Sequence, residues 1–400
     1  MSKSKSCEDV VNSYDLDYKR VIDLDIYLIT HGLPSGSMLL HSLLDSHPEI
    51  ITIPGTPDIY SFVNDNYIDT SSVLNKFEEC NPDFFNTLEQ TVDKYWYSGL
   101  DTLGVNKDEG ILTNKKLFER YFKSFLKEKN IDSSNIILAL FYSYSMVHGC
   151  NLKSKKIIVM HPHYHDKAIF LNNIFPKSKC IVTVRDPIQT YYSAIKRSSL
   201  KAGIRNLAFN HAGYIYRESL NVVPLIENNI EFRIVKVEEI FSDDYVMLGL
   251  CSFLHIDYHL SLKKSTFNGK KWWGANPTYK LNKFSLDRHK INYELSFVEN
   301  CLFSIVFRKH YNIFGYIKPN SSCKYLPVFF LLLLPTTEDF KWFKNIFTTL
   351  SRDDGSVKYL IHITASLIFE RLRLIALFYN EKSHSYDCFI KKSLISINKQ

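Results

Sequence analysis

Apolar runs separated by polar loops predict alternating strands and helices along much of this chain. Residues 26–30 form a short run rich in β-branched and aromatic side chains, which is typical of a buried strand. A loop with glycine, proline and serine residues follows. Apolar residues then recur at helical spacing, at Met38, Leu39, Leu40, Leu43 and Leu44. Because a helix N-terminus presents unpaired N–H groups and the positive end of its dipole, this pattern predicts an anion site.

Two interpretations of the loop remain open. Gly36 permits close approach of the backbone, and the hydroxyls of Ser35 and Ser37 can donate to phosphate oxygens. Alternatively, this is an ordinary turn from strand to helix in which Ser37 is the helix N-cap.

A second strand and helix follow at residues 180–194. Residues 180–184 form another apolar strand, Asp186 is suited to cap a helix, and Pro187 to occupy its first turn. Ser193 lies about two helical turns after Asp186 and therefore projects from the same face. Arg185, at the end of the strand, and Ser193 on the helix could together bind a second phosphate.

The two stretches together resemble the nucleotide-binding motifs of sulfotransferases that use 3′-phosphoadenosine 5′-phosphosulfate (PAPS). In that family a strand-loop-helix similar to Gly-x-x-Arg-Ser-Gly-Thr-Thr binds the 5′-phosphosulfate, and an Arg and a Ser eight residues apart bind the 3′-phosphate. Here Pro34 stands at the position of the family's basic residue. The resemblance implies a 5′ site formed by Gly32, Ser35, Gly36, Ser37 and Met38, and a 3′ site formed by Arg185 and Ser193.

The same resemblance implies a general base near residue 161. Several family branches carry a catalytic Glu after the first helix, but Pro54, Gly55 and Thr56 occupy that neighbourhood here. Residues 156–160 predict a strand that ends before His161, much as cytosolic sulfotransferases place a histidine in a Lys-Thr-His-Leu-Pro run. His161 is therefore the first candidate for the base and His163 the second.

These histidines could instead have a structural role or bind a metal. A loop histidine that only hydrogen-bonds backbone is as good an explanation of His161 as a base. A metal site formed by His161, His163 and His165 is disfavoured, because proline interrupts the run and no second group of ligands is evident. We expect no metal.

Residues 266–274 resemble a loop that closes over the nucleotide in other branches of the family. The resemblance implies that Trp272 or Trp273 stacks on adenine and that Lys270 or Lys271 meets a phosphate. Packing of either Trp in the core is an equally good explanation.

Composition favours a folded enzyme with an anionic ligand. The chain of 400 residues is 45% hydrophobic and carries a formal net charge of +7, without the basic stripe of a nucleic-acid-binding protein. Its eight cysteines include no Cys-x-x-Cys pair, which predicts reduced thiols in a cytoplasmic protein. The longest apolar run, 325–335, is about half the roughly 20 residues that a membrane span needs, and the N-terminus lacks the apolar core of a secretory signal.

The predicted architecture is an α/β, P-loop-like three-layer fold with a central parallel sheet and a C-terminal helical appendage. Residues 1–21 are a polar tail, 22–320 a sulfotransferase-like domain, and 321–400 a helical segment that packs on the core or on another subunit of a homo-oligomer. Helical stretches in 57–150 are predicted to be surface helices or a lid that builds the acceptor pocket.

The expected reaction is sulfuryl transfer from PAPS to a hydroxyl or amine of a glycan or small-molecule acceptor, with a carbohydrate favoured. Lys, Arg and loop amides can stabilise the developing charge without a metal. One alternative is a nucleotide-binding relative that has lost catalysis, consistent with the missing cation and Glu. A P-loop kinase or NTPase is weaker, because no Gly-Lys-Ser/Thr is present to hold β/γ-phosphates and magnesium.

Overall fold

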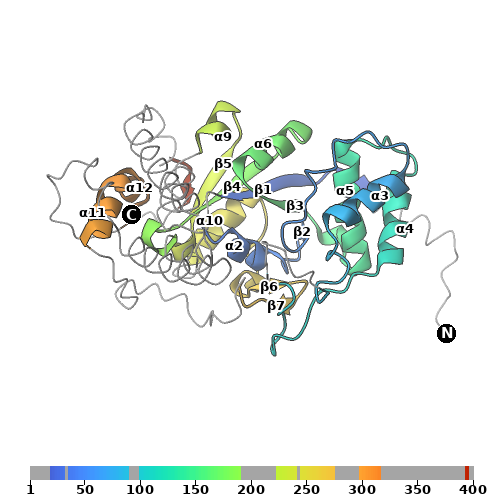
Figure 1. Ribbon diagram of the computed structural model, residues 1–400, viewed down its shortest axis with the longest axis horizontal. Coiled ribbons are helices and arrows are strands. Elements are labelled where there is room, and N and C mark those ends of the chain that lie inside the picture. Colours follow the sequence, from blue (N-terminus) through green and yellow to red (C-terminus); the bar gives the residue numbers. More distant parts are fainter. Residues whose placement is uncertain are drawn as a thin grey trace, which may run out of the picture.

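A six-stranded parallel sheet forms the centre of the molecule (Figure 1). The computed structural model describes residues 19–31, 35–89, 99–190, 222–240, 244–274, 297–316 and 392–395. The strand order is β2-β3-β1-β4-β5-β8. The strands are β1 (Asp25–His31), β2 (Ile50–Thr52), β3 (Ile157–His163), β4 (Lys179–Val184), β5 (Phe232–Lys236) and β8 (Leu394–Ile395). The predicted α/β class with a central parallel sheet is confirmed.

The order of the strands creates a switch point at β1. From β1 the chain continues to β2 and β3 on one side, and β4 and β5 lie on the other. Ligands of open α/β sheets bind beyond the carboxyl ends of the strands at such a point. The loop after β1, the end of β3 and the end of β4 all reach this edge, so the fold brings the sequence candidates to one place.

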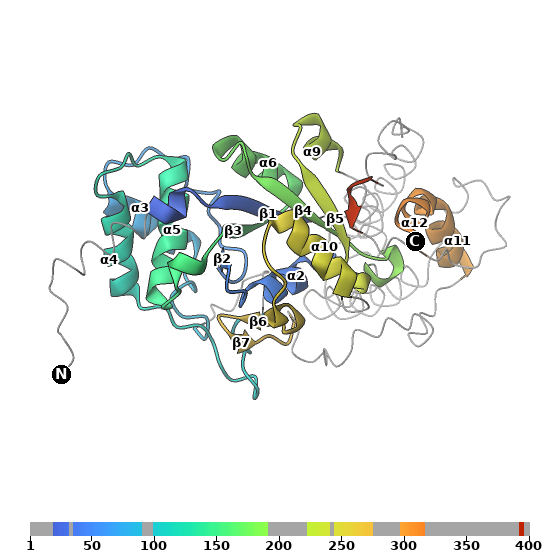
Figure 2. The same cartoon turned by 180° about the vertical axis from the view of Figure 1, so that it is seen from behind.

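Both faces of the sheet are apolar, because both are covered by helices. Tyr27 and Ile29 of β1 face one core cluster, with α2 (Ser37–Leu44) and α10 (Asp244–Leu254). Ile26 and Leu28 face the other, with α6 (His165–Ile174) and α9 (Val223–Glu227). Figure 2 shows α10 crossing the first face and α6 and α9 on the second.

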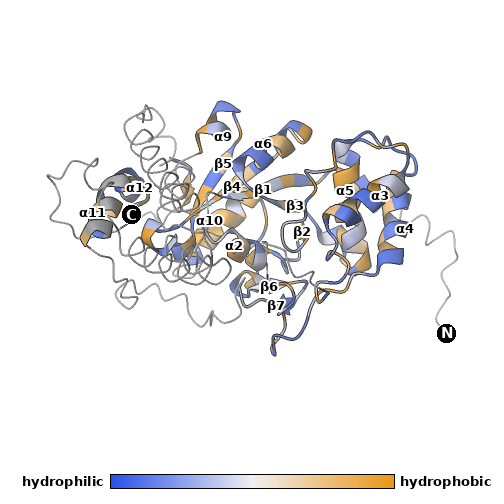
Figure 3. Ribbon diagram, in the orientation of Figure 1, coloured by the Kyte–Doolittle hydropathy of each residue, from blue (hydrophilic) through white to orange (hydrophobic). Residues whose placement is uncertain are grey.

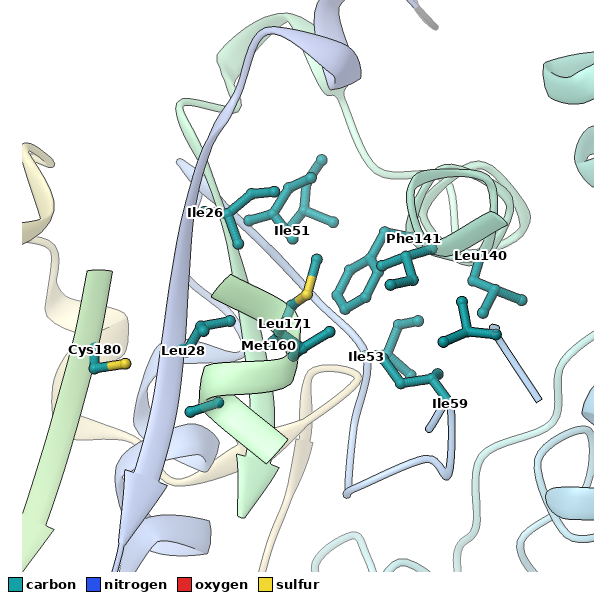
Figure 4. Packing of buried hydrophobic residues seen from close by; sticks show 14 of the residues in the cluster. Ile26, Leu28, Ile51, Ile53, Ile59, Leu140, Phe141, Met160, Leu171 and Cys180 are labelled. Carbon is teal, nitrogen blue, oxygen red and sulfur yellow. The ribbon is translucent and has the colours of Figure 1, made fainter. Parts of the chain in front are cut away.

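Beside the β2 edge of the sheet lie three further helices, α3 (Thr70–Cys80), α4 (Lys115–Leu126) and α5 (Ser133–Val147) (Figure 1). The expectation of surface helices is wrong for α5, which is buried along residues 136–145 and shares a core with the sheet. Figure 4 shows Leu140 and Phe141 of α5 facing Ile51, Ile53 and Met160. The outer helices α3 and α4 carry polar residues as well as apolar ones (Figure 3).

A small hairpin of β6 (Thr266–Phe267) and β7 (Lys270–Lys271) packs on α2 (Figure 1). Ser42 of α2 hydrogen-bonds Ser265 at 2.6 Å, and Ser46, just after the helix, hydrogen-bonds Thr266 at 2.8 Å. Among the described residues, the short 3-10 helices are η1 (Leu152–Ser154), η3 (Val237–Glu239) and η4 (Leu260–Lys263), and two further α-helices are α11 (Phe297–Val306) and α12 (Arg308–Phe314).

The C-terminal segment contains a strand that the sequence did not predict. Leu394 pairs with Ile234 and Ile395 with Val235, so β8 extends the sheet beyond β5. The expected tail over 1–18 and the expected helices within 317–391 lie outside the described residues. In the part of the chain that is described, no helix is both long and apolar enough to cross a bilayer.

One cysteine prediction is wrong. Cys80, Cys150, Cys180 and Cys251 are free, but Cys301 is disulfide-bonded. The absence of Cys-x-x-Cys spacing could not exclude this bond, because a disulfide can join cysteines far apart in sequence.

Candidate functional site

The loop between β1 and α2 turns sharply at Gly36. Gly36 has φ 79° and ψ 21°, a left-handed conformation that favours glycine. A Cβ at this position would lie 2.8 Å from Cγ1 of Val237, so the backbone also passes close to η3. Ser37 begins α2, and the N-cap is Gly36, not Ser37. The alternative in which Ser37 caps the helix is therefore wrong, and the first N–H groups of α2 have no partner within the helix.

Buried hydroxyls support this turn. Ser35 and Ser37 are each 3% exposed, and Oγ of Ser35 lies 2.7 Å from Oγ1 of Thr183 on β4. This contact ties the loop to the strand that leads to Arg185. Met38 follows in the first turn of α2, partly buried against the same core. Gly32 and Pro34 lie outside the described residues.

Arg185 leaves β4 at the same edge of the sheet. Its Nη2 lies 3.5 Å from Oε1 of Gln189, a weak contact, while its Nε is buried and has no hydrogen-bond partner in the described structure. Asp186 accepts from the N–H groups of Ile188 and Gln189, which confirms the predicted N-cap. A buried donor without a partner is costly, and an anion bound here would satisfy it. Ser193 lies outside the described residues.

Glu238 holds the backbone after Arg185. Its carboxylate accepts from the N–H of Asp186 at 2.7 Å and from the hydroxyl of Tyr316 at 2.9 Å. Burial raises the pKa of this carboxyl, and those hydrogen bonds and the Arg185 charge oppose the rise. Glu238 makes no ion pair with Arg185 among the described residues, although the two charges attract each other.

Four histidines from three elements gather beside the phosphate loop. Nε2 of His31, at the end of β1, lies 3.0 Å from Nδ1 of His163 on β3. Nδ1 of His161 lies 3.2 Å from Nδ1 of His41 on α2. His41 in turn places Nε2 2.6 Å from Oγ1 of Thr52. The sequence candidates His161 and His163 are thus brought together with His31, and His41 is a functional candidate that the sequence analysis missed.

His165, the third member of the His-x-His-x-His run, does not join this group. It begins α6, and its Nδ1 lies 3.0 Å from Oγ1 of Thr30. Burial lowers its pKa to about 4.

Burial keeps the central imidazoles uncharged. Burial, followed by the neighbouring His41, lowers the pKa of His161 well below its usual range, and burial lowers the pKa of His41 to about 3. Two neutral rings share one proton between their Nδ1 atoms. If His41 donates from Nε2 to Thr52, its Nδ1 accepts from Nδ1 of His161, and Nε2 of His161 carries the lone pair. That Nε2 is buried and has no partner in the described structure.

An irregularity in β3 sets the positions of the His161 and His163 rings. The register with β1 shifts between the pairs Leu28–Met160 and Thr30–His163, which leaves one extra residue on β3 around Pro162. His163 follows with φ 76°, a conformation that is uncommon outside glycine and costs of order 1–3 kcal/mol. The prediction that the strand ends before His161 is wrong, because β3 continues to His163. Proline is accommodated at the bulge, where the ladder lacks regular pairing.

A cavity of about 340 Å³ opens beside the histidines. His161 and His163 line it, together with the segment 53–58, which holds the positions where the family's Glu was sought. Tyr144 of α5 also lines it, and the Tyr144 hydroxyl is buried without a partner in the described structure. Tyr60, Phe84 and Tyr164 add aromatic surface, and Asp58, Asn81 and Lys167 add polar groups. This volume is at the small end of ligand pockets and suits one compact acceptor group.

Two predicted nucleotide contacts lie in the β6–β7 hairpin region with structural partners. Trp272 is 5% exposed and packs edge-on against Phe267 at 5.5 Å. Lys270 donates to the carbonyl of Gly110 and forms an ion pair with Glu109 at 3.0 Å. These contacts favour the core-packing alternative for Trp272 and give Lys270 protein partners in place of a phosphate.

Comparison with known proteins agrees with the two motifs. The model of the sulfotransferase family matches residues 31–218, which include the phosphate loop, His161, His163 and Arg185. Over this segment the chain is similar to the sulfotransferase family. No curated protein matches the sequence.

Solved structures give only a weak likeness. The sulfotransferase STF1 from Mycobacterium tuberculosis is 13% identical, with 63% of this chain and 74% of that chain covered and a TM-score of 0.32. The sulfotransferase STF9 from Mycobacterium avium is 15% identical, with 63% and 70% covered and a TM-score of 0.31. At such scores the assignment rests on the family match and not on these structures.

Proposed function

We propose that this protein transfers a sulfuryl group from PAPS to a hydroxyl or amine of a carbohydrate acceptor. The observation that supports this best is the order of groups at the carboxyl edge of the sheet. Arg185 follows β4, which lies on one side of β1, and α2 follows β1 itself, whereas β3 with His161 and His163 lies on the other side. The histidines follow, and the cavity of about 340 Å³ lies beyond them. Donor, base and acceptor would then stand in line.

The donor would bind through the loop and Arg185. In this proposal the amides of Gly32 and residues 35–38 bind the 5′-phosphosulfate, and Arg185 with Ser193 binds the 3′-phosphate. The left-handed Gly36 and the buried Nε of Arg185, which has no partner among the described residues, fit two anionic groups. We assign no nucleotide contact to Lys270 or Trp272, because their partners occupy them elsewhere.

His161 is the proposed general base, with His163 second. As the acceptor oxygen forms its bond to sulfur, the bond from sulfur to the phosphate oxygen of PAPS breaks. The acceptor proton passes to Nε2 of His161, and PAP and the sulfated acceptor leave. Loop amides would stabilise the charge that develops on the departing 5′-phosphate, while Arg185 holds the 3′-phosphate, so the proposal assigns no step to a metal. The aromatic walls of the cavity suit the apolar face of a sugar ring.

The experiment compares His161→Gln with wild type, because glutamine preserves much of the volume but takes up no proton. PAP release is followed with PAPS and a panel of glycans, and PAP affinity by calorimetry. We expect kcat to fall roughly 10²–10⁴-fold and PAP affinity to stay unchanged. His259→Asn, at a histidine outside the site, is the control. Normal turnover by His161→Gln would remove His161 as the base. PAP binding by wild type without transfer to any acceptor would favour the non-catalytic alternative.

The cellular compartment stays a prediction. The four free cysteines agree with a reducing cytoplasm, whereas the disulfide of Cys301 is typical of an oxidising compartment. Thiol labelling of the protein from its native cells, with and without reductant, would distinguish the two.

A further inference from the structure

The rings of His31, His161 and His163 converge on one point, although a single proton transfer needs only one of them. One ring nitrogen of each lies within 4.8 Å of the other two, although the residues come from two strands and His31 is 130 positions before His161. His31 is 2% and His161 8% exposed. A single base needs one imidazole and a group to orient it. Three converging imidazoles are instead a common donor set for a transition metal.

We propose that His31, His161 and His163 form a binding site for a divalent transition-metal ion of the zinc class. Neutral imidazole nitrogen suits zinc, copper, nickel and iron, and three protein ligands leave one position of a tetrahedral ion open. His161 and His163 line the cavity, so the open position would face it.

The spacing of the nitrogens fits after small movements. With Zn–N distances of about 2.0–2.1 Å, tetrahedral ligand atoms lie about 3.3 Å apart. Nε2 of His31 and Nδ1 of His163 are already 3.0 Å apart, joined by a shared proton. On metal binding, that proton would move to the other nitrogen of the ring that carries it. Both rings stay neutral, and no oxidant or other reactant is required.

His161 supplies the second observation that points to a ligand. Its Nε2 is buried without a hydrogen-bond partner in the described structure. Its Nδ1 contacts His41, which is held by Thr52. This series of contacts is similar to the outer contacts that orient metal-bound histidines. His163 has a left-handed backbone, and such strained conformations cluster at ligand-binding and active sites.

Metal binding has a consequence that rests on the proposed function. The ion would take the lone pair on Nε2 of His161, the same pair that accepts the proton of the acceptor. We therefore expect zinc to inhibit sulfuryl transfer, with a midpoint that equals its dissociation constant for the cluster.

Binding is tested on the full chain after treatment with a chelator and dialysis. Cobalt(II) is added, its visible d–d absorption is recorded, and zinc is used to displace it. We expect one cobalt ion per chain. His31→Gln and His163→Asn each remove one ligand, and asparagine also tolerates the left-handed backbone at 163. His259→Asn is the matched control, because asparagine can still accept from the N–H of Ser261 as His259 does.

Loss of a supporting contact alone lowers metal affinity about 10–100-fold, so loss of a ligand should lower it at least about 100-fold. Such a loss in both variants, each folded by circular dichroism, with no change in the control, supports the site. Equal cobalt binding by both variants and wild type would overturn it, as would a wild type that gives no tetrahedral cobalt spectrum.

Activity separates the two proposals. Zinc that binds the cluster and stops transfer supports both. Zinc that binds the cluster while transfer continues would overturn the role of His161 as base and leave the metal site supported. If the wild type binds no cobalt and the His161→Gln variant loses transfer, the role of His161 as base is supported and the metal site is overturned.

Discussion

Replacing Gly36 by alanine tests whether the phosphate loop has the described shape. Alanine in a left-handed conformation costs about 1–2 kcal/mol. Its Cβ would also lie 2.8 Å from Cγ1 and 3.0 Å from Cγ2 of Val237, both part of a buried side chain. Overpacking of this kind costs about 1–3 kcal/mol. We therefore expect the free energy of unfolding to fall by about 2–5 kcal/mol.

Gly149 offers a control that isolates the backbone contribution. It also has a positive φ, of 69°, but a Cβ there would meet nothing within 4 Å. Gly149→Ala should therefore cost only about 1–2 kcal/mol. In a double-mutant cycle, Val237→Ala should reduce the cost of Gly36→Ala by about 1–3 kcal/mol, because it removes both contacting methyl groups.

The assay is urea unfolding followed by circular dichroism, with PAP affinity measured in parallel. Because the loop amides move when the backbone shifts, Gly36→Ala should also weaken PAP binding, whereas Gly149→Ala should not. Equal destabilisation by Gly36→Ala and Gly149→Ala, together with no coupling to Val237, would show that the loop does not pack against η3 as described.

Three further predictions follow from neighbouring residues. Arg185→Ala should weaken PAP binding by about 1.5–3 kcal/mol in calorimetry, whereas Arg233→Ala, whose guanidinium lies over Phe253, should not; equal affinities would remove Arg185 from the 3′ site. Thr52→Val removes the partner of His41 and should lower kcat at least about tenfold with PAP affinity unchanged; a normal kcat would show that Thr52 does not set the tautomer. Burial raises the pKa of Asp45 from 3.8 to about 6, so the folded state favours the neutral carboxyl. The neutral carboxyl adds about 3 kcal/mol to the free energy of unfolding below pH 3.8, and this contribution is lost as pH rises through 6. Asp45→Asn should flatten that decline in unfolding experiments between pH 4 and 7, and an unchanged slope would contradict the buried carboxyl.

Local sequence patterns predicted the individual strands, turns and caps of the site better than the contacts between them. The strand-loop-helix around Gly36 and the cap at Asp186 depend on neighbouring residues, so the sequence was sufficient for both. The burial of Trp272 depends on contact with Phe267 across a hairpin turn, so the sequence alone left core packing and nucleotide stacking as equally good explanations.

The histidine cluster shows why tertiary contacts escaped prediction. His31 shares the side of β1 that carries Tyr27 and Ile29, and His161 shares the side of β3 that carries Ile157 and Val159. Strand alternation could have placed both on the face covered by α2. It could not reveal that β1 and β3 are neighbours, or that a bulge turns the next histidine toward the same point.

The pairing of β8 with β5 has a consequence for synthesis of the chain. Leu394 and Ile234 are separated by 160 positions, yet they are adjacent in the sheet. While the ribosome is still making the intervening residues, the outer edge of β5 has no strand to pair with, and an open edge can recruit other chains. The methyl group of Ile395 also fills space against Gly249 of α10, so packing there is completed equally late. The edge of β5 therefore stays open during synthesis until residues 394 and 395 emerge.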